Sequence, residues 1–357
     1  MKKIFSIIAI TCIFFSSIQA QTENYKNTID VISKNINKYF YEPATGLYLE
    51  NHDKIYNQKP HSFLWPLCAL LQATNEMEVL NPSGCYMKPV ELAISHYYNA
   101  NPPMGAYQAY VSTEELDTRY YDDNQWLGIA FIDAYSRTKK KEYLNLATGI
   151  YRFMMTGYDT ITGGGIYWRE GDKSSKNTCS NGPGIVLALQ LHLATEDRKY
   201  LDTALLLYKW TNKYLLSKNR LFFDAIKTKD LSVDKAIYTY NTGTMLQSNV
   251  LLYRITKQKQ YLDEACSIAD AAEKFFYKNN RLPDNYWFNA VMLRGFIELY
   301  KVEKNKNRLH FFIKEANRVW KEETDDQHLL GVKKAKSLID QAGMLEIYSR
   351  IQQLKLN

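Results

Sequence analysis

KEYLNLATGIYRFM (residues 141–154), RKYLDTALLLYKW (residues 198–210) and KQYLDEACSIADAA (residues 259–272) are three versions of one segment. Their shared Tyr-Leu pairs recur after 57 and 61 residues, and apolar residues follow at helical spacing. A second apolar-periodic segment precedes each of the three. A repeat of helix, short turn, helix and long loop predicts stacked helical hairpins.

Extending this pattern outward predicts twelve helices in two alternating types. Helices of the first type are expected near His61–Ala73, Asn124–Arg137, Pro183–Thr195, Gly243–Thr256, Tyr286–Tyr300 and Lys336–Ile351. The second type comprises the three quoted segments, an opening helix near Glu23–Phe40, and helices near Lys88–Ala100 and Asn307–Trp320. Six hairpins favour a closed, all-α (α/α)6 barrel with the more apolar first type inside. An open tetratricopeptide-like solenoid is the alternative, but its period of about 34 residues does not fit.

The first twenty residues, MKKIFSIIAITCIFFSSIQA, have the pattern of a secretory signal peptide. Lys2 and Lys3 form the basic region, Ile4–Phe15 the apolar core, and small residues end at Ala20. This core is too short to span a bilayer comfortably, so stable membrane insertion is not expected. We predict cleavage after Ala20, export to the periplasm or the cell exterior, and a single catalytic domain over residues 21–357.

Charge and cysteine usage exclude several classes of function. The net charge of +7 falls to +5 when the two N-terminal lysines leave (7 − 2), and the remaining charges are mixed in sign. Nucleic acid is therefore not an expected partner. The spacing of Cys68, Cys85, Cys179 and Cys266 matches no zinc or redox motif, and no HExxH or EF-hand sequence occurs. We expect neither a metal nor another cofactor. We also expect the protein to be a monomer.

Closure of the barrel brings the loops before the inner helices to one rim. These loops carry HSFLWP (61–66), RYYDDNQW (119–126), NTCSNGPG (177–184), IYTYNTG (237–243) and DNYWFN (284–289). Aromatic rings stack on the apolar face of a sugar, while amides and carboxylates bond its hydroxyls. The rim therefore predicts a glycan cleft, with Trp126 and Trp168 as the best aromatic candidates.

Two adjacent carboxyl groups, Asp122 and Asp123, stand at this rim. In the simpler reading Asp123 caps the following helix and Asp122 is a solvated neighbour. In the functional reading the two are the catalytic pair of a glycoside hydrolase, at the separation of about 5 Å typical of retaining enzymes. The helix N-terminus favours one ionised carboxylate, and repulsion keeps the other protonated to higher pH. One site then supplies a nucleophile and a proton donor.

YYDDNQWLGIAFIDAY (120–135), followed in order by GGGIYW (163–168), KNTCSNGP (176–183) and YTYNTG (238–243), resembles glycoside hydrolase family 76. That family comprises endo-α-1,6-mannanases, and the match runs from about His61 to Phe276. The resemblance implies an (α/α)6 fold and a retaining mechanism, with Asp122 as nucleophile and Asp123 as general acid/base. It further implies sugar contacts by Asn124, Trp126, Asn181, Asp224, Tyr240 and Asn241. One departure is Leu127, where a second Trp often follows in this family.

The expected function is an exported, retaining glycoside hydrolase that cleaves α-1,6-mannosidic linkages of a mannan backbone. Two other classes stay open. A sugar epimerase or an unsaturated uronyl hydrolase shares this barrel, and an epimerase would need histidines in the cleft, which no motif here suggests. A non-catalytic barrel could bind a glycan without cutting it.

Overall fold

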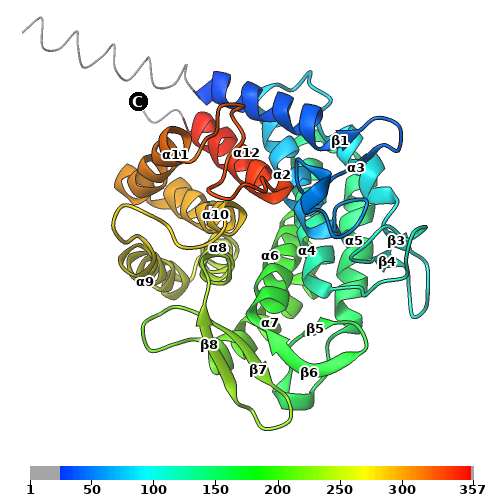
Figure 1. Cartoon of the computed structure of the whole chain (residues 1–357). Helices are drawn as coiled ribbons and strands as arrows, with labels where there is room; N and C mark the ends of the chain where they lie inside the picture. The colour runs from blue at the N-terminus through cyan, green and yellow to red at the C-terminus, as the bar shows by residue number, and fades with distance from the viewer. Residues whose placement is uncertain (1–24, 355–357) are drawn as a thin grey trace, which may run out of the picture.

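The structure, a computed structural model, describes residues 25–354 and is mostly helical (Figure 1). The inner helices are α2 (Leu64–Leu80), α4 (Tyr121–Thr138), α6 (Thr178–Thr195), α8 (Thr239–Thr256), α10 (Tyr286–Glu303) and α12 (Leu338–Gln353). The outer set comprises the helical segment 25–39 and α3 (Met87–Ser95), α5 (Lys141–Thr156), α7 (Arg198–Leu215), α9 (Lys259–Phe276) and α11 (His310–Glu322). The predicted signal peptide lies outside the described residues.

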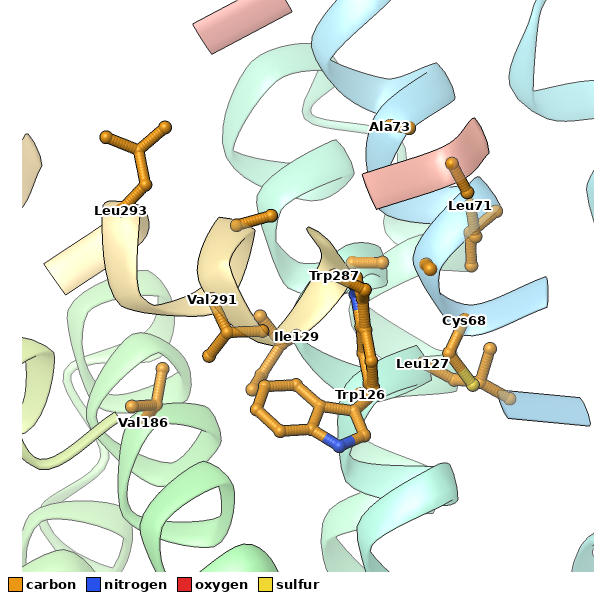
Figure 2. Packing of buried hydrophobic residues seen from close by; sticks show 14 of the residues in the cluster. Cys68, Leu71, Ala73, Trp126, Leu127, Ile129, Val186, Trp287, Val291 and Leu293 are labelled. Atoms are coloured by element: carbon orange, nitrogen blue, oxygen red, sulfur yellow. The ribbon is translucent and has the colours of Figure 1, made fainter. Parts of the chain in front are cut away.

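The inner helices form a closed ring. Each contacts the next one along the chain, and α12 packs against α2, so the last inner helix meets the first (Figure 1). Figure 2 shows the core where α2, α4 and α10 meet, with Trp126 and Trp287 in contact and with Leu127 and Cys68 to their right. The predicted (α/α)6 barrel is confirmed and the open solenoid is wrong. Within residues 25–354, no helix combines the length and the apolar character needed to cross a membrane.

A repeated two-residue turn joins inner to outer helices. A threonine ends α4, α6 and α8, and its hydroxyl donates to the carbonyl four residues earlier (Thr138, Thr195, Thr256). The same hydroxyl accepts the N–H of the residue two positions later, the N-cap of the outer helix. Between them stands a left-handed residue with φ near +60° (Lys139, Glu196, Lys257). The outer helices therefore begin at the first residue of each quoted repeat.

Three inner helices begin earlier than predicted, whereas α10 begins at the predicted residue and α2 and α12 begin two or three residues later. Helix α4 starts at Tyr121 instead of Asn124, α6 at Thr178 instead of Pro183, and α8 at Thr239 instead of Gly243. Pro183 is therefore the sixth residue of α6 and lies inside the helix. Polar residues expected in loops lie in the first helical turns, because their side chains bond the preceding loop.

The long loops contain strands that the sequence prediction missed. Strands β5 (Tyr167–Arg169), β6 (Asp172–Asn177), β7 (Phe223–Lys227) and β8 (Val233–Ile237) form an antiparallel sheet in chain order. Two short hairpins, β1–β2 (Tyr41–Glu42, Leu47–Tyr48) and β3–β4 (Tyr98–Asn99, Ala106–Tyr107), lie in earlier loops. The segment DKSSKN of β6 has no apolar alternation, which is the signal that would have predicted a strand.

A buried side-chain amide ties the preceding loop to three inner helices. Asn124, Asn181 and Gln341 each occupy the fourth position of their helix. Each amide NH2 donates to a loop carbonyl and to the carbonyl four residues earlier, while its oxygen accepts the N–H of the same loop residue. The loop residues are Tyr107, Ile166 and Leu330. We call this arrangement the amide clamp.

We predict that Gln341→Ala lowers the free energy of unfolding by about 2–4 kcal/mol, because it leaves the buried N–H and C=O of Leu330 unpaired. Urea denaturation measures this loss. Gln260→Ala, which removes an exposed amide from α9, is the control and should change stability by less than about 0.5 kcal/mol. Equal effects of the two substitutions would contradict a structural role for the clamp.

Candidate active site

A cleft of about 430 Å³ opens at the rim where α2 and α4 begin. Aromatic and acidic side chains dominate its wall, which consists of Phe63, Trp65, Ala109, Asp117, Tyr120, Asp122, Asp123 and Trp168. Phe63 and Tyr120 are the N-cap residues of the two helices. The predicted aromatic cleft therefore exists, and it contains both members of the Asp pair.

Asp122 and Asp123 are the second and third residues of α4, so the reading of Asp123 as the N-cap is wrong. Oδ1 of Asp122 accepts the backbone N–H of Asp123 at 3.1 Å. Oδ2 of Asp122 accepts the indole N–H of Trp168 at 3.3 Å, and the Cys179 thiol also hydrogen-bonds this carboxylate. Asp122 is thus held by donors from three different elements.

The two carboxyl groups differ in their expected protonation. Burial raises the pKa of Asp122 to about 6, against the opposing effect of its hydrogen bonds from Cys179, Asp123 N–H and Trp168. Burial also raises the pKa of Asp123 well above its ordinary value, and the charges of Asp122 and Asp117 raise it further. Near neutral pH the pair therefore holds one proton, with Asp122 ionised and Asp123 protonated.

Trp168 is positioned by its surroundings and keeps an exposed face. Its side chain is 38% exposed, and its ring lies 5.1 Å from that of Tyr120 at an angle of 54°. The preceding turn contains three glycines with positive φ, at residues 163–165. The buried Lys176 ammonium holds this turn through the carbonyls of Ile161 and Gly164. An exposed, fixed indole beside a carboxylate can stack on a sugar ring.

A second group of predicted residues adjoins Asp122 through Cys179. The Cys179 thiol hydrogen-bonds both Asp122 and the Tyr240 hydroxyl. The Tyr240 ring stacks on Phe288, with centroids 3.9 Å apart. Asn241 donates its amide to Asp224 at 3.1 Å, and burial raises the pKa of that carboxyl. The Cys179 thiol therefore connects Tyr240 to Asp122, and the charge of Asp224 raises the pKa of both Cys179 and Tyr240.

Three residues predicted to hold sugar serve the protein interior instead. Asn124 and Asn181 are fully buried, and the amide clamp uses the nitrogen and the oxygen of each side chain. Trp126 is 4% exposed and packs edge-on against Trp287, while the Arg294 guanidinium lies 5.6 Å from its centroid (Figure 2). We leave these three out of the proposed ligand contacts.

Sequence reasoning missed several residues of the cleft. Trp65 lies in the quoted HSFLWP stretch, and its position beside a predicted helix start could have identified it. Cys179 lies in NTCSNGPG but was interpreted only as one of four cysteines without a metal pattern. Asp117 precedes the quoted rim stretch, and nothing in the sequence connects it with Asp123.

The histidines near the barrel rim and inside the helices lie outside the cleft wall. Within residues 25–354 the cleft wall contains no histidine, and no group of three or more His, Cys, Asp or Glu side chains could hold a metal ion. His61 lies between Glu42 and Glu114, and His192 bonds the carbonyl of Asp197. The histidine chemistry of an epimerase thus finds no support in this cleft.

A helical barrel with two adjacent carboxyl groups in an aromatic cleft defines a carbohydrate-active protein. The family described as glycosyl hydrolase family 76 matches residues 24–355, and the chain belongs to this family.

Relatives and solved structures agree with this membership. The mannan endo-1,6-alpha-mannosidase DCW1 of Candida glabrata is 28% identical over 183 residues, 47% of this chain and 41% of that protein. The GH76 alpha-mannanase BT2949 of Bacteroides thetaiotaomicron is 26% identical, with a TM-score of 0.86 over 95% of this chain and 98% of that chain. The chain spans less than half the length of the curated relatives it matches.

A third similarity concerns the fold alone. An inactive variant of the alpha-1,6-mannanase GH76A of Salegentibacter sp. HEL1_6, in complex with α-1,6-mannotriose, is 20% identical to this chain. Its TM-score is 0.80, over 92% of this chain and 99% of that chain. The two proteins therefore share the barrel fold although their sequence identity is low.

We predict that Asp123→Asn stabilises the protein at pH 8, since a carboxyl group whose pKa rises on folding lowers the stability of the folded state above its ordinary pKa. The folded state binds more protons than the unfolded chain once pH exceeds the ordinary Asp value, so stability falls as pH rises through the raised pKa. The gain should vanish near pH 3, where both states are protonated.

Urea denaturation of wild type and variant at pH 3 and pH 8 measures this difference. Asp326→Asn is the control, because Asp326 is exposed and also follows another aspartate. A gain for Asp123→Asn that is the same at both pH values would contradict a raised pKa as its cause.

Proposed function

We propose that the protein is a retaining glycoside hydrolase that cleaves α-1,6-mannosidic linkages. The observation that carries the proposal is the position of Asp122 and Asp123 in the first turn of α4, within an aromatic cleft. Their opposite protonation at neutral pH supports the two roles that a retaining mechanism needs. Family membership and the names of the relatives support mannan as the substrate.

In the first step the Asp122 carboxylate attacks the anomeric carbon of the sugar. The glycosidic C–O bond breaks, and the leaving oxygen takes the proton of Asp123. A covalent glycosyl ester forms on Asp122, and Asp123 becomes ionised. Loss of the charge on Asp122 makes the ionisation of Asp123 easier, because the two carboxylates are then never charged at the same time.

In the second step water attacks the same carbon and gives its proton to Asp123. The ester bond breaks, Asp122 regains its charge, and the product keeps the α configuration. The indole N–H of Trp168 and the Cys179 thiol hold the Asp122 carboxylate in one orientation in both steps. Tyr240 and Asp224 are the proposed contacts to a neighbouring sugar unit, and the fully buried Asn241 positions Asp224 through its amide.

Export and domain organisation belong to the same proposal. The basic and apolar pattern of residues 1–20 supports a cleaved signal peptide, with the protein acting in the periplasm or outside the cell. The remaining chain is proposed as a single catalytic domain, because the family match covers residues 24–355 without interruption.

We predict that wild type releases reducing sugar from debranched α-1,6-mannan and that both Asp variants do not. Asp122→Asn should lower kcat by at least about 10³-fold, because it removes the nucleophile. Asp123→Asn should lower kcat by about 10²–10⁴-fold, because it removes the proton donor. Proton NMR of the first product should show the α anomer, as retention requires.

Asp326→Asn is the matched control for this experiment and should keep full activity. If wild type releases no sugar but binds mannan as the variants do, the protein is a glycan-binding barrel and the hydrolase proposal fails. Initial formation of the β anomer would contradict the retaining mechanism while leaving hydrolysis in place.

We predict that the rate rises with pH through an apparent pKa of about 6, as Asp122 ionises, and falls again when Asp123 loses its proton. Cys179→Ala removes a donor to ionised Asp122, so the acidic limb should move to higher pH by about 0.5–1 unit. Cys179→Ser keeps a donor and should restore the limb. Cys85→Ala, at an exposed thiol, is the control, and an unmoved limb in Cys179→Ala would exclude this role.

A further inference from the structure

A second cavity of about 480 Å³ lies on the side of the barrel, between the β3–β4 hairpin and helix α5. Figure 1 shows the hairpin beside α5 at the edge of the molecule. Met104, Ile150 and Phe153 give the cavity an apolar floor, and its rim is polar. None of its lining residues belongs to the wall of the cleft. We call this cavity the hairpin pocket.

The wall that the hairpin provides is fixed by buried hydrogen bonds. The Arg119 guanidinium donates to the carbonyls of Asn101, Pro102 and Met104 at 2.9–3.0 Å. It also forms a bidentate ion pair with Glu170, at 2.6 and 2.7 Å. The amide clamp of Asn124 holds the other end of the hairpin at Tyr107. A wall held this way keeps the pocket open without a ligand.

The wall that α5 provides contains a glycine where the fold does not need one. Gly149 lies in the middle of the helix, and a Cβ added there would meet no atom within 4 Å. Glycine inside a helix costs about 1 kcal/mol relative to alanine. No close packing explains the residue, so its effect is to leave space in the pocket.

The polar rim carries side chains without partners. Arg152 forms neither a hydrogen bond nor an ion pair within residues 25–354, whereas every other arginine of that range forms an ion pair. Glu142 and Asn145 line the same face of α5 and, within the described part of the chain, make no hydrogen bond. The Tyr98 ring is 49% exposed and lies against Gly105.

An exposed aromatic ring, an apolar floor and planar polar groups with free hydrogen-bonding capacity match a pyranose. One face of such a sugar is apolar, and its neighbouring hydroxyls suit the paired N–H groups of a guanidinium and the oxygens of a carboxylate. The opposite charges of Arg152 and Glu142 disfavour a strongly charged ligand. The volume of about 480 Å³ is in the range of small-ligand sites.

We infer that the hairpin pocket is a second glycan-binding site, which holds pyranose units of the polysaccharide at a distance from the cleft. The identity of that polysaccharide as α-1,6-mannan rests on the proposed function. A second site raises affinity for a polymer that reaches both places, and it does not affect an oligosaccharide short enough to occupy the cleft alone.

The test uses the full protein with Gly149→Leu, which fills the pocket, and Tyr98→Ala/Arg152→Ala, which removes its sugar contacts. Retardation in native gels that contain α-1,6-mannan measures affinity for the polymer, and hydrolysis of α-1,6-mannotetraose measures the cleft. Both variants should bind the polymer about five-fold or more weakly, and their rates on the tetrasaccharide should stay within about two-fold of wild type. Thermal unfolding of Gly149→Leu should occur at or above the wild-type temperature, since the helix loses a glycine.

Arg198→Ala on α7 is the matched control, because it removes an exposed arginine from another outer helix. Unchanged polymer affinity in both pocket variants would overturn the inference and leave the proposed function intact. If wild type does not cut α-1,6-mannan, the proposed function fails, and the gels are repeated with other polysaccharides. If one of these polysaccharides retards wild type but not Gly149→Leu, the result still supports the hairpin pocket as a glycan-binding site. If none of these polysaccharides retards wild type, the inference is overturned.

Discussion

The rim of this barrel depends on one interaction, the amide clamp in the first turn of the inner helices α4, α6 and α12. A side-chain amide there pairs with one residue of the preceding loop as a neighbouring strand would, and it satisfies both backbone groups of that residue at once. Asn124 lies next to Asp123, so the same bond that holds the β3–β4 hairpin also fixes the turn carrying the carboxyl pair. The side chain that makes the proposed site rigid, Asn124, therefore directly follows the two carboxyl groups proposed to carry the reaction.

The electrostatics of the site follow from this geometry. When water is largely excluded, ionising both carboxyl groups in one helical turn costs much free energy, because the two charges repel each other. Donors from Trp168 and Cys179 converge on Asp122, while no hydrogen bond to the Asp123 carboxyl is found among the described residues. The asymmetry of donors, more than the helix N-terminus, decides which carboxyl is ionised. Stability is given up at neutral pH so that one proton is held where the proposed reaction needs it.

The hairpins were predictable because their signal is local. Helical spacing and the repeated Tyr-Leu segments lie within each unit, and the outer helices α5, α7 and α9 begin at the quoted residues. The Asp pair was predictable because it is adjacent in sequence and carries the family resemblance. The sequence could not predict the structural roles of Asn124 and Asn181, since an amide that bonds a loop and an amide that bonds a sugar look the same in one sequence. The same holds for a tryptophan such as Trp126, which can pack in the core or stack on a sugar. The strands β5–β8 were also missed, because β6 lacks apolar alternation and pairs with β7, whose residues lie about 50 positions further along the chain.

The contact between α12 and α2 has a consequence for how the chain acquires its structure. Each helical hairpin is formed by neighbours in sequence, but the ring is completed only by two helices separated by most of the chain. Hairpin formation is therefore fast and local, whereas closure carries the entropy of a very long loop. Until α12 has been synthesised, the face of α2 that α12 covers in the folded protein has no such cover. A nascent protein of this design needs protection from aggregation until its last helix emerges.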